Sequence, residues 1–104
     1  MNDENLEIKE TIDGDLCRFI ASGRVDSNNA GIMETNLDRV LSEGQKNIIL
    51  NMESVKYLSS IGIRIILKTY KKAYETGGTF QIENPSEIVK NVLGMVALNQ
   101  MLLK

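Results

Sequence analysis

The feature that most restricts the fold is a short segment in the middle of the chain, 47–52, with three apolar residues in succession. Ile48, Ile49 and Leu50 do not alternate with polar residues, as they would in a strand with one solvent-exposed face. Successive apolar residues are typical of a strand with both faces covered, as in parallel sheets. We therefore expect a central strand here, with helices among its neighbours.

A hairpin is predicted ahead of this strand. Leu6, Ile8 and, after a polar gap, Ile12 lie at alternate positions, which is the pattern of a half-buried strand. The turn-forming sequence Asp-Gly-Asp at 13–15 follows. Segment 16–21 then forms the second arm, with Cys17 and Phe19 on one face.

Three helices are predicted in the rest of the chain. The polar cluster 27–29 suits the N-cap of a first helix that Gly44 ends. A second helix begins at Ser59-Ser60 and ends at Gly77-Gly78, and a third follows Asn84-Pro85-Ser86. The inward face of the second is expected to comprise Ile63, Ile66, Leu67, Tyr70 and Tyr74; that of the third, Ile88, Val89, Val92 and Leu93.

Between these two helices, 79–83 alternates again as a strand. The predicted order is β-β-α-β-α-β-α, so the fold class is α/β. We expect a single domain over residues 1–104, with a mixed sheet of four to five strands and helices mainly on one face. Segment 95–104 is apolar and ambiguous, and 101–103 is a candidate final strand.

Composition excludes several classes of function. The 104 residues include one cysteine and no histidine, so zinc sites and histidine-dependent nucleophilic catalysis are not expected. The net charge of −2 disfavours nucleic acid as a partner. We expect no signal peptide in the polar N-terminal segment, and no apolar run is long enough to span a membrane. We expect a cytoplasmic protein without enzymatic activity, cofactor or metal.

Three segments taken together resemble the STAS family, which includes anti-sigma-factor antagonists, stressosome subunits and the tails of sulfate transporters. The first is Gly-Arg-Val-Asp-Ser-Asn-Asn-Ala at 23–30. The second runs from Asn47 to Ile63 and contains Ser-Ser-Ile-Gly at 59–62. The third is Gly-Gly-Thr-Phe-Gln-Ile-Glu-Asn at 77–84. The resemblance spans nearly the whole chain in order, although the family's usual final helix is missing from the pattern.

This chain departs from the family's pattern at the motif around Gly62. In regulated members the motif is Asp-Ser-Ser-Gly or Asp-Ser-Thr-Gly, and a kinase phosphorylates the hydroxyl residue immediately before the glycine. Aligned on Gly62, that position here holds Ile61, while Ser60 and Ser59 precede it. A slip of one residue would make Ser60 the phosphoacceptor but misalign Gly62. We favour the alignment on Gly62 and keep Ser60 and Ser59 as candidate phosphorylation sites.

The resemblance implies that this chain binds a kinase-type anti-sigma factor, a histidine-kinase-like serine kinase, and thereby regulates sigma-factor-dependent transcription. The alternative is a regulatory subunit of a stressosome or of an ABC lipid-transport ATPase. A monomer or weak dimer is expected. The implied contact residues are Asp26, Ser59, Ser60, Ile61, Gly62 and Arg64.

Each contact residue also has a structural interpretation. A serine at 59 or 60 can cap the second helix, and Asp26 can cap the first. Ile61 can belong to the core, Gly62 can serve close packing, and Arg64 can be simply solvated.

Overall fold

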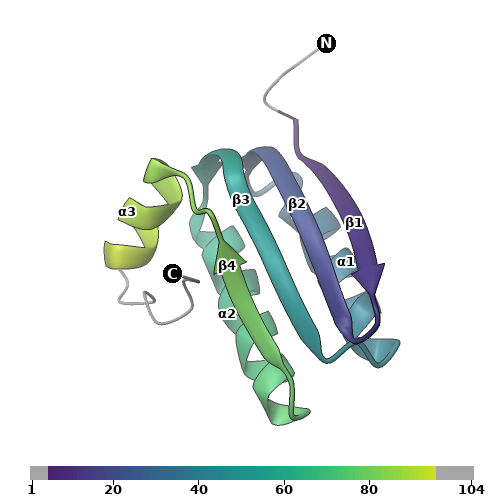
Figure 1. Ribbon diagram of the computed structural model, residues 1–104. Coiled ribbons are helices and arrows are strands. Elements are labelled where there is room, and N and C mark those ends of the chain that lie inside the picture. The colour runs from purple at the N-terminus through teal and green to yellow at the C-terminus, as the bar shows by residue number, and fades with distance from the viewer. Residues whose placement is uncertain (1–4, 96–104) are drawn as a thin grey trace.

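The computed structural model describes residues 5–95 and shows a four-stranded mixed sheet with three helices (Figure 1). In chain order the elements are β1 (Glu7–Asp13), β2 (Leu16–Val25), α1 (Ala30–Ser42), β3 (Asn47–Leu58), α2 (Ser60–Glu75), β4 (Thr79–Glu83) and α3 (Glu87–Met95). The strands lie in the order β1-β2-β3-β4; the first pair is antiparallel and the others are parallel. The predicted α/β class, hairpin and element order are confirmed; the candidate strand 101–103 lies outside the described residues.

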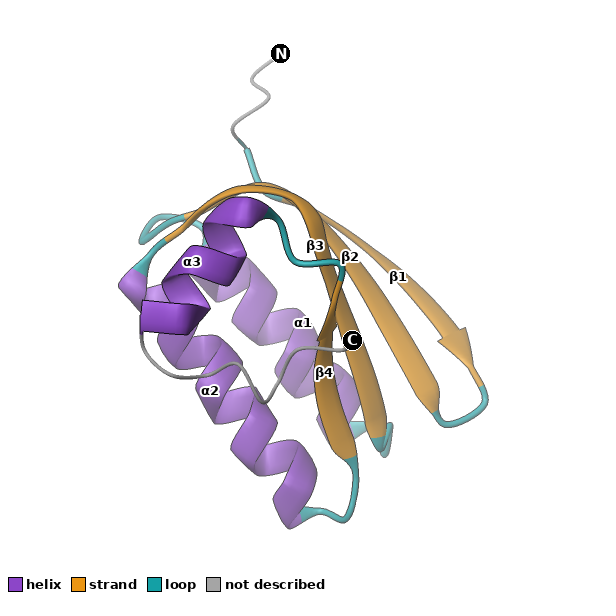
Figure 2. Ribbon diagram, turned by 60° about the vertical axis from the view of Figure 1, so that its left-hand side comes forward, coloured by secondary structure: helices purple, strands orange, loops and turns teal. Residues whose placement is uncertain are grey.

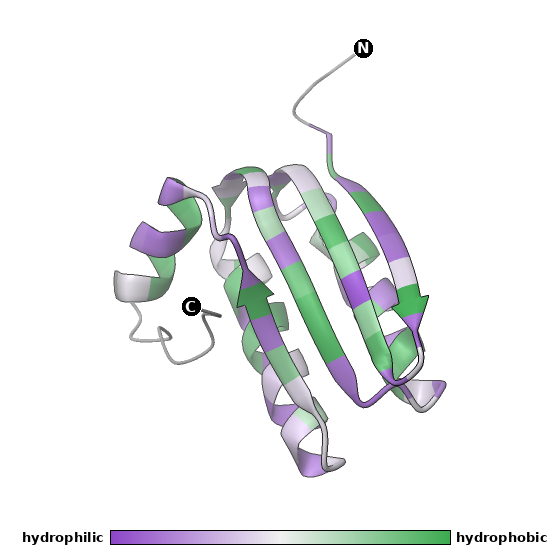
Figure 3. Ribbon diagram, in the orientation of Figure 1, coloured by the Kyte–Doolittle hydropathy of each residue, from purple (hydrophilic) through white to green (hydrophobic). Residues whose placement is uncertain are grey.

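The helices lie on one side of the sheet, as predicted (Figure 2). The opposite face faces the viewer in Figure 3, where hydrophilic and hydrophobic residues alternate along the strands. Alternate strand residues enter the core between the sheet and the helices; its largest fully buried side chains include Phe19, Ile48, Leu50, Met52, Phe80 and Ile82. Between α1 and α2, Lys68 pairs with Glu34, and Lys72 Nζ lies 3.4 Å from Asp38 Oδ1.

The expectation that β3 is covered on both faces is wrong, because no described helix covers the second face. Ile48 and Leu50 are buried, but Ile49 points to the open face and is only partly buried. Its partner on β2 is Arg18, whose guanidinium lies 3.2 Å from Glu83 on β4. Since β3 lies between β2 and β4, the stem of Arg18 must cross it. That stem partly covers the open face near Ile49 in place of a helix.

Glu83 is the centre of a polar contact on this open face. Its second carboxylate oxygen accepts a hydrogen bond from Asn51 Nδ2 at 2.8 Å. The hydrogen bond from Asn51, followed by that from Arg18, lowers the pKa of Glu83 below its ordinary value. These side chains join β2, β3 and β4 on the face that the helices leave open.

The predicted inward face of α2 is rotated relative to the observed one. The buried residues are Gly62, Ile65, Ile66, Thr69 and Ala73, whereas Tyr74 is 51% exposed. A threonine is tolerated in the core because its hydroxyl donates to the carbonyl oxygen of Ile65 at 2.9 Å. The polarity of the residues therefore did not identify the buried face of α2. In α3, Val89 and Leu93 are buried as predicted, but Ile88 is exposed.

Strand β3 is longer than the predicted segment 47–52 and continues to Leu58. Along β3, one extra residue lies between the residues that pair with Ile20 and Ser22 of β2. A second extra residue lies between the residues that pair with Gly23 and Arg24. Each marks a β-bulge, which inserts an unpaired residue and breaks the period of two. After Met52 the buried residues are accordingly three apart, at Val55 and Leu58. This spacing concealed the strand in the sequence.

Ser86 fastens the start of α3 to β3. Its hydroxyl donates to the carbonyl oxygen of Val55 at 2.7 Å and accepts from the N–H of Val89 at 3.3 Å, as the predicted cap requires. Ser86→Ala removes both contacts and leaves a strand carbonyl without its partner. We expect the free energy of unfolding to fall by about 1–2 kcal/mol in urea titrations.

Ser42→Ala is the matched control for this prediction, since the hydroxyl of Ser42 donates only to an exposed carbonyl at the end of α1. Its effect is expected to stay within about 0.5 kcal/mol. Equal effects of the two substitutions would contradict the assigned role of Ser86.

Candidate functional site

The candidate site lies where β2 and β3 end and α2 begins. Val25 and Leu58 are paired at this end of the sheet, and the N–H of Ser59 donates to the carbonyl oxygen of Val25 at 2.9 Å. The side-chain oxygen of Ser59 accepts from the N–H of Gly62 at 3.3 Å, which makes Ser59 the N-cap of α2. The predicted strand-to-helix junction is thus present, and the capping interpretation holds for Ser59.

Ser60 is the first residue of α2 and is exposed. Within residues 5–95 its hydroxyl takes part in no hydrogen bond. Arg64, four residues later, is also exposed. A negative group on Ser60 would lie near the positive end of the helix dipole and one turn from a cation. Of the two candidate phosphoacceptors, Ser60 is the free hydroxyl and Ser59 the engaged one.

Ile61 and Gly62 lie deeper than their neighbours. Ile61 is partly buried and packs against the hydrophobic core. Gly62 is buried, and a Cβ atom there would stand 2.8 Å from side-chain atoms of both Leu58 and Val25. The small size of Gly62 therefore lets α2 approach the ends of the two strands, as the packing interpretation requires. A direct contact of either residue with a partner stays a prediction.

Asp26 organises the loop between β2 and α1. Its Oδ1 atom accepts hydrogen bonds from the N–H groups of Asn28 at 3.0 Å and Asn29 at 3.2 Å. The N–H of Asp26 donates in return to Oδ1 of Asn29 at 2.9 Å. Asn29 occupies the N-cap position but its side chain makes no capping bond. The prediction that residues 27–29 cap α1 is corrected to this extent: the carboxylate one position earlier holds the loop.

Two further residues join this site that the sequence reasoning missed, Arg24 and Tyr57. The Cζ atom of Arg24 lies 4.2 Å from the centroid of the Tyr57 ring, and its Nε atom is 3.9 Å from Oδ2 of Asp26. The two residues are paired across β2 and β3 only because of the second bulge. No sequence pattern indicated this pairing, since without the second bulge Lys56 would lie opposite Arg24.

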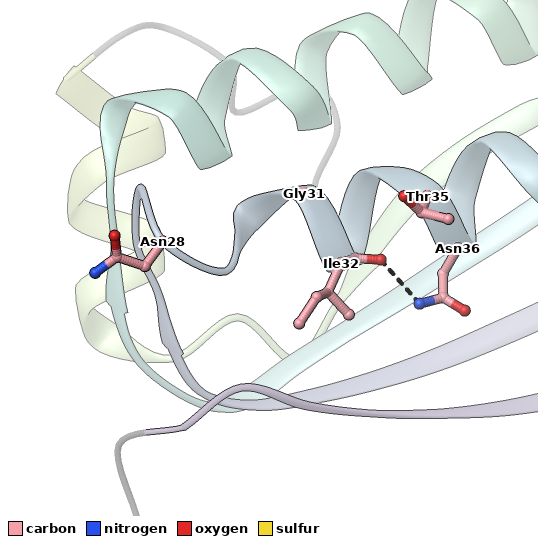
Figure 4. A pocket seen from close by; sticks show the side chains of 5 residues that line it. All are labelled: Asn28, Gly31, Ile32, Thr35 and Asn36. Atoms are coloured by element: carbon pink, nitrogen blue, oxygen red, sulfur yellow. Dashed lines mark hydrogen bonds between the residues drawn. The ribbon is translucent and has the colours of Figure 1, made fainter.

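Two open hollows lie elsewhere on the surface. One, of about 530 Å³, lies along the outer side of α1 and is lined by Asn28, Gly31, Ile32, Thr35 and Asn36. Figure 4 shows Asn36 donating to the main-chain oxygen of Ile32, 2.8 Å away. The other, of about 510 Å³, runs between β3 and α3. Neither contains Ser59, Ser60 or Arg64.

Cys17 is not a candidate nucleophile. It is fully buried on β2, and desolvation, reinforced by the negative charge of Glu10, raises the pKa of its thiol to about 11. Among residues 5–95 no group of three side chains is arranged to hold a metal ion. Over the same range, none of the helices combines the length and apolar character needed to cross a bilayer.

Known anti-sigma factor antagonists are similar to this chain in sequence and in fold. One relative, BtrV of Bordetella bronchiseptica, described as a candidate anti-sigma factor antagonist, is 30% identical over 69 residues. That match covers 66% of this chain and 59% of BtrV. The fold is also that of an anti-sigma factor antagonist from Mycobacterium paratuberculosis, with a TM-score of 0.85, 17% identity and coverage of 97% of this chain and 86% of the other.

The unphosphorylated form of the anti-sigma factor antagonist SpoIIAA gives a TM-score of 0.83 at 17% identity, covering 95% of this chain and 86% of the other. The phosphorylated form of SpoIIAA from Bacillus has the same fold, with a TM-score of 0.78 at 16% identity, covering 95% of this chain and 89% of the other. The STAS domain family model matches residues 7–103. With the hairpin, the parallel crossovers and the strand-to-helix junction in place, this match establishes that the chain belongs to the STAS domain family.

Proposed function

We propose that this chain is a binding module of the anti-sigma-factor-antagonist type, which docks a kinase-type anti-sigma factor and thereby regulates sigma-factor-dependent transcription in the cytoplasm. The partner is a histidine-kinase-like ATPase. The docking face comprises Asp26 and residues 59–64. The observation that carries the proposal is the exposed Ser60 at the first position of α2, directly after a capped junction at the sheet end.

Physical features of the face support a binding role. The junction is rigid, because main-chain and capping hydrogen bonds hold Ser59 to β2 and to α2. Rigid exposed residues lose little conformational entropy when a partner binds. The similarity to anti-sigma factor antagonists supports an anti-sigma factor as that partner.

Phosphorylation by the partner is the sharpest test. The wild-type chain, Ser60→Ala and Ile61→Ser are each incubated with the kinase-type anti-sigma factor and ATP, and intact mass is measured. With Gly62 as the aligned glycine, the wild type is expected to gain no phosphate, and Ile61→Ser is expected to gain one, because a hydroxyl then precedes Gly62.

A phosphate that appears on the wild type and is lost in Ser60→Ala would mean that the alignment slips by one residue and that Ser60 is the switch. Thr35→Ser, on the outer side of α1, controls for indiscriminate phosphorylation of new serines. Direct binding is measured in parallel by calorimetry. No binding to any kinase-type anti-sigma factor of the source organism would refute the proposal.

The second candidate, a regulatory subunit of a stressosome or of an ABC lipid-transport ATPase, is favoured by one observation. Ile61 carries no hydroxyl and packs against the core, so the aligned position cannot act as a phosphate switch. If this chain binds such an ATPase and does not bind an anti-sigma factor, the second candidate is favoured.

A further inference from the structure

Arg24 is held in a defined position beside the proposed docking face. Its guanidinium lies over the ring of Tyr57, with Cζ 4.2 Å from the centroid, and Tyr57 is its direct partner across the two strands. Both side chains remain more than one-third exposed, Arg24 at 36% and Tyr57 at 38%. A guanidinium held over a ring face by the cation–π attraction can still donate its N–H groups to a further partner.

These N–H groups are free within the part of the chain that the structure describes. The nearest carboxylate oxygen, Oδ2 of Asp26, is 3.9 Å from Nε, which is too long for a hydrogen bond. The other oxygen of Asp26 accepts from main-chain N–H groups of the α1 loop. Arg18 and Arg39, in contrast, each donate to a carboxylate on another element. Arg24 is thus positioned by its contact with the Tyr57 ring, while its side chain donates no hydrogen bond within residues 5–95.

The charges around Arg24 favour an acidic partner group. Residues 24–29 and 57–64 contain two cations, Arg24 and Arg64, and one carboxylate, Asp26. Lys56 is not counted with them, because it lines the hollow between β3 and α3 together with Glu53 and Glu87. This local excess of positive charge occurs in a chain whose net charge is −2. A small cationic region on an acidic protein suits a few carboxylates of a protein partner better than a polyanion, which the rest of the surface would repel.

We infer that Arg24, supported by Tyr57, receives an Asp or Glu side chain of the partner protein in a two-pronged ion pair and so helps to select the partner. The inference rests on the proposed function, because it places this contact at the edge of the same docking face. A planar guanidinium and a carboxylate form two parallel hydrogen bonds, which an ammonium group cannot reproduce.

The test measures binding of the purified anti-sigma factor, or of whichever identified protein the wild-type chain retains, to four variants by calorimetry. Arg24→Lys is expected to weaken binding about tenfold, because an ammonium group cannot form the two parallel hydrogen bonds of a guanidinium. Arg24→Glu also reverses the charge and is expected to weaken binding about 100-fold. Tyr57→Leu is expected to weaken binding about threefold to tenfold through loss of the stacking support. Lys71→Glu, the matched charge reversal on an exposed residue of α2, is expected to change affinity less than twofold.

A charge swap then identifies the contact. Each surface Asp and Glu of the partner is replaced by Lys, and one of these partner variants is expected to restore binding to Arg24→Glu. Wild-type affinity of Arg24→Glu, or loss of binding that no partner variant restores, would overturn the inference while leaving the proposed function intact. Restoration with a partner that has no kinase-type ATPase domain would refute the proposed function and retain the inference. A wild-type chain that retains no protein would refute both.

Discussion

Replacing Gly78 by alanine is expected to lower the free energy of unfolding by at least about 3 kcal/mol and the melting temperature by more than about 10 °C. A Cβ atom at this position would stand 1.7 Å from the carbonyl oxygen of Lys46 and 2.6 Å from its carbonyl carbon. These are main-chain atoms, which cannot move aside as the end of a flexible side chain can. The same Lys46 oxygen accepts the N–H of Thr79 at 2.8 Å, so a shift would also disturb the first residue of β4.

Gly31→Ala is the matched control for Gly78→Ala. Gly31 lies in the first turn of α1, and a Cβ atom there would meet nothing within 4 Å. Because alanine favours the helix, this variant is expected to be more stable by up to about 1 kcal/mol. Thermal unfolding followed by circular dichroism measures both variants. A Gly78→Ala protein as stable as the wild type would mean that the α2–β4 turn is packed less closely than described.

A negative charge at position 60 is expected to raise the stability of the chain and to weaken its binding to the partner. An aspartate at the first position of α2 lies at the positive end of the helix dipole, so Ser60→Asp should raise the free energy of unfolding by about 0.3–1 kcal/mol. The same carboxylate would lie in the docking face and face an acidic partner group. Like charges brought together at an interface cost several kcal/mol, so affinity should fall about 100-fold or more.

Thr35→Asp adds the same charge on the outer side of α1, away from this face, and should leave affinity within about twofold of the wild type. Calorimetric titration with the anti-sigma factor gives the affinities, and urea titration gives the stabilities. If Thr35→Asp abolishes binding and Ser60→Asp does not, the partner binds at the α1 hollow of Figure 4 and the proposed face is incorrect.

The sequence predicted the order of elements because each helix and strand has a local signal. Ser86 after Pro85 marked the start of α3, and alternation in 79–83 marked β4. The face of α2 was misplaced because burial of Thr69 depends on a bond to its own helix backbone, which hydropathy does not register. Local patterns are sufficient where burial alone decides the structure.

Only those residues of the site that stand in local sequence motifs could be predicted. Ser59, Ser60 and Asp26 stand in recognisable motifs, and the structure places them in one strand-to-helix junction and one helix-entry loop. Arg24 and Tyr57 come together only through the register of two strands far apart in sequence. That register depends on bulges, for which a single sequence contains no clear signal.

The two bulges of β3 have a consequence for how this chain can vary. Between Ile20 and Val25 on β2, and Asn51 and Leu58 on β3, the second strand uses two residues more than the first. Each bulge by itself keeps the paired residues on the same face, because Gly23 and Val55 are both buried after the first bulge and Val25 and Leu58 are both buried after the second. A bulge therefore absorbs one residue without turning the rest of the strand over. Homologues should accordingly tolerate the gain or loss of single residues at these two positions, while Leu58 and the start of α2 keep their places.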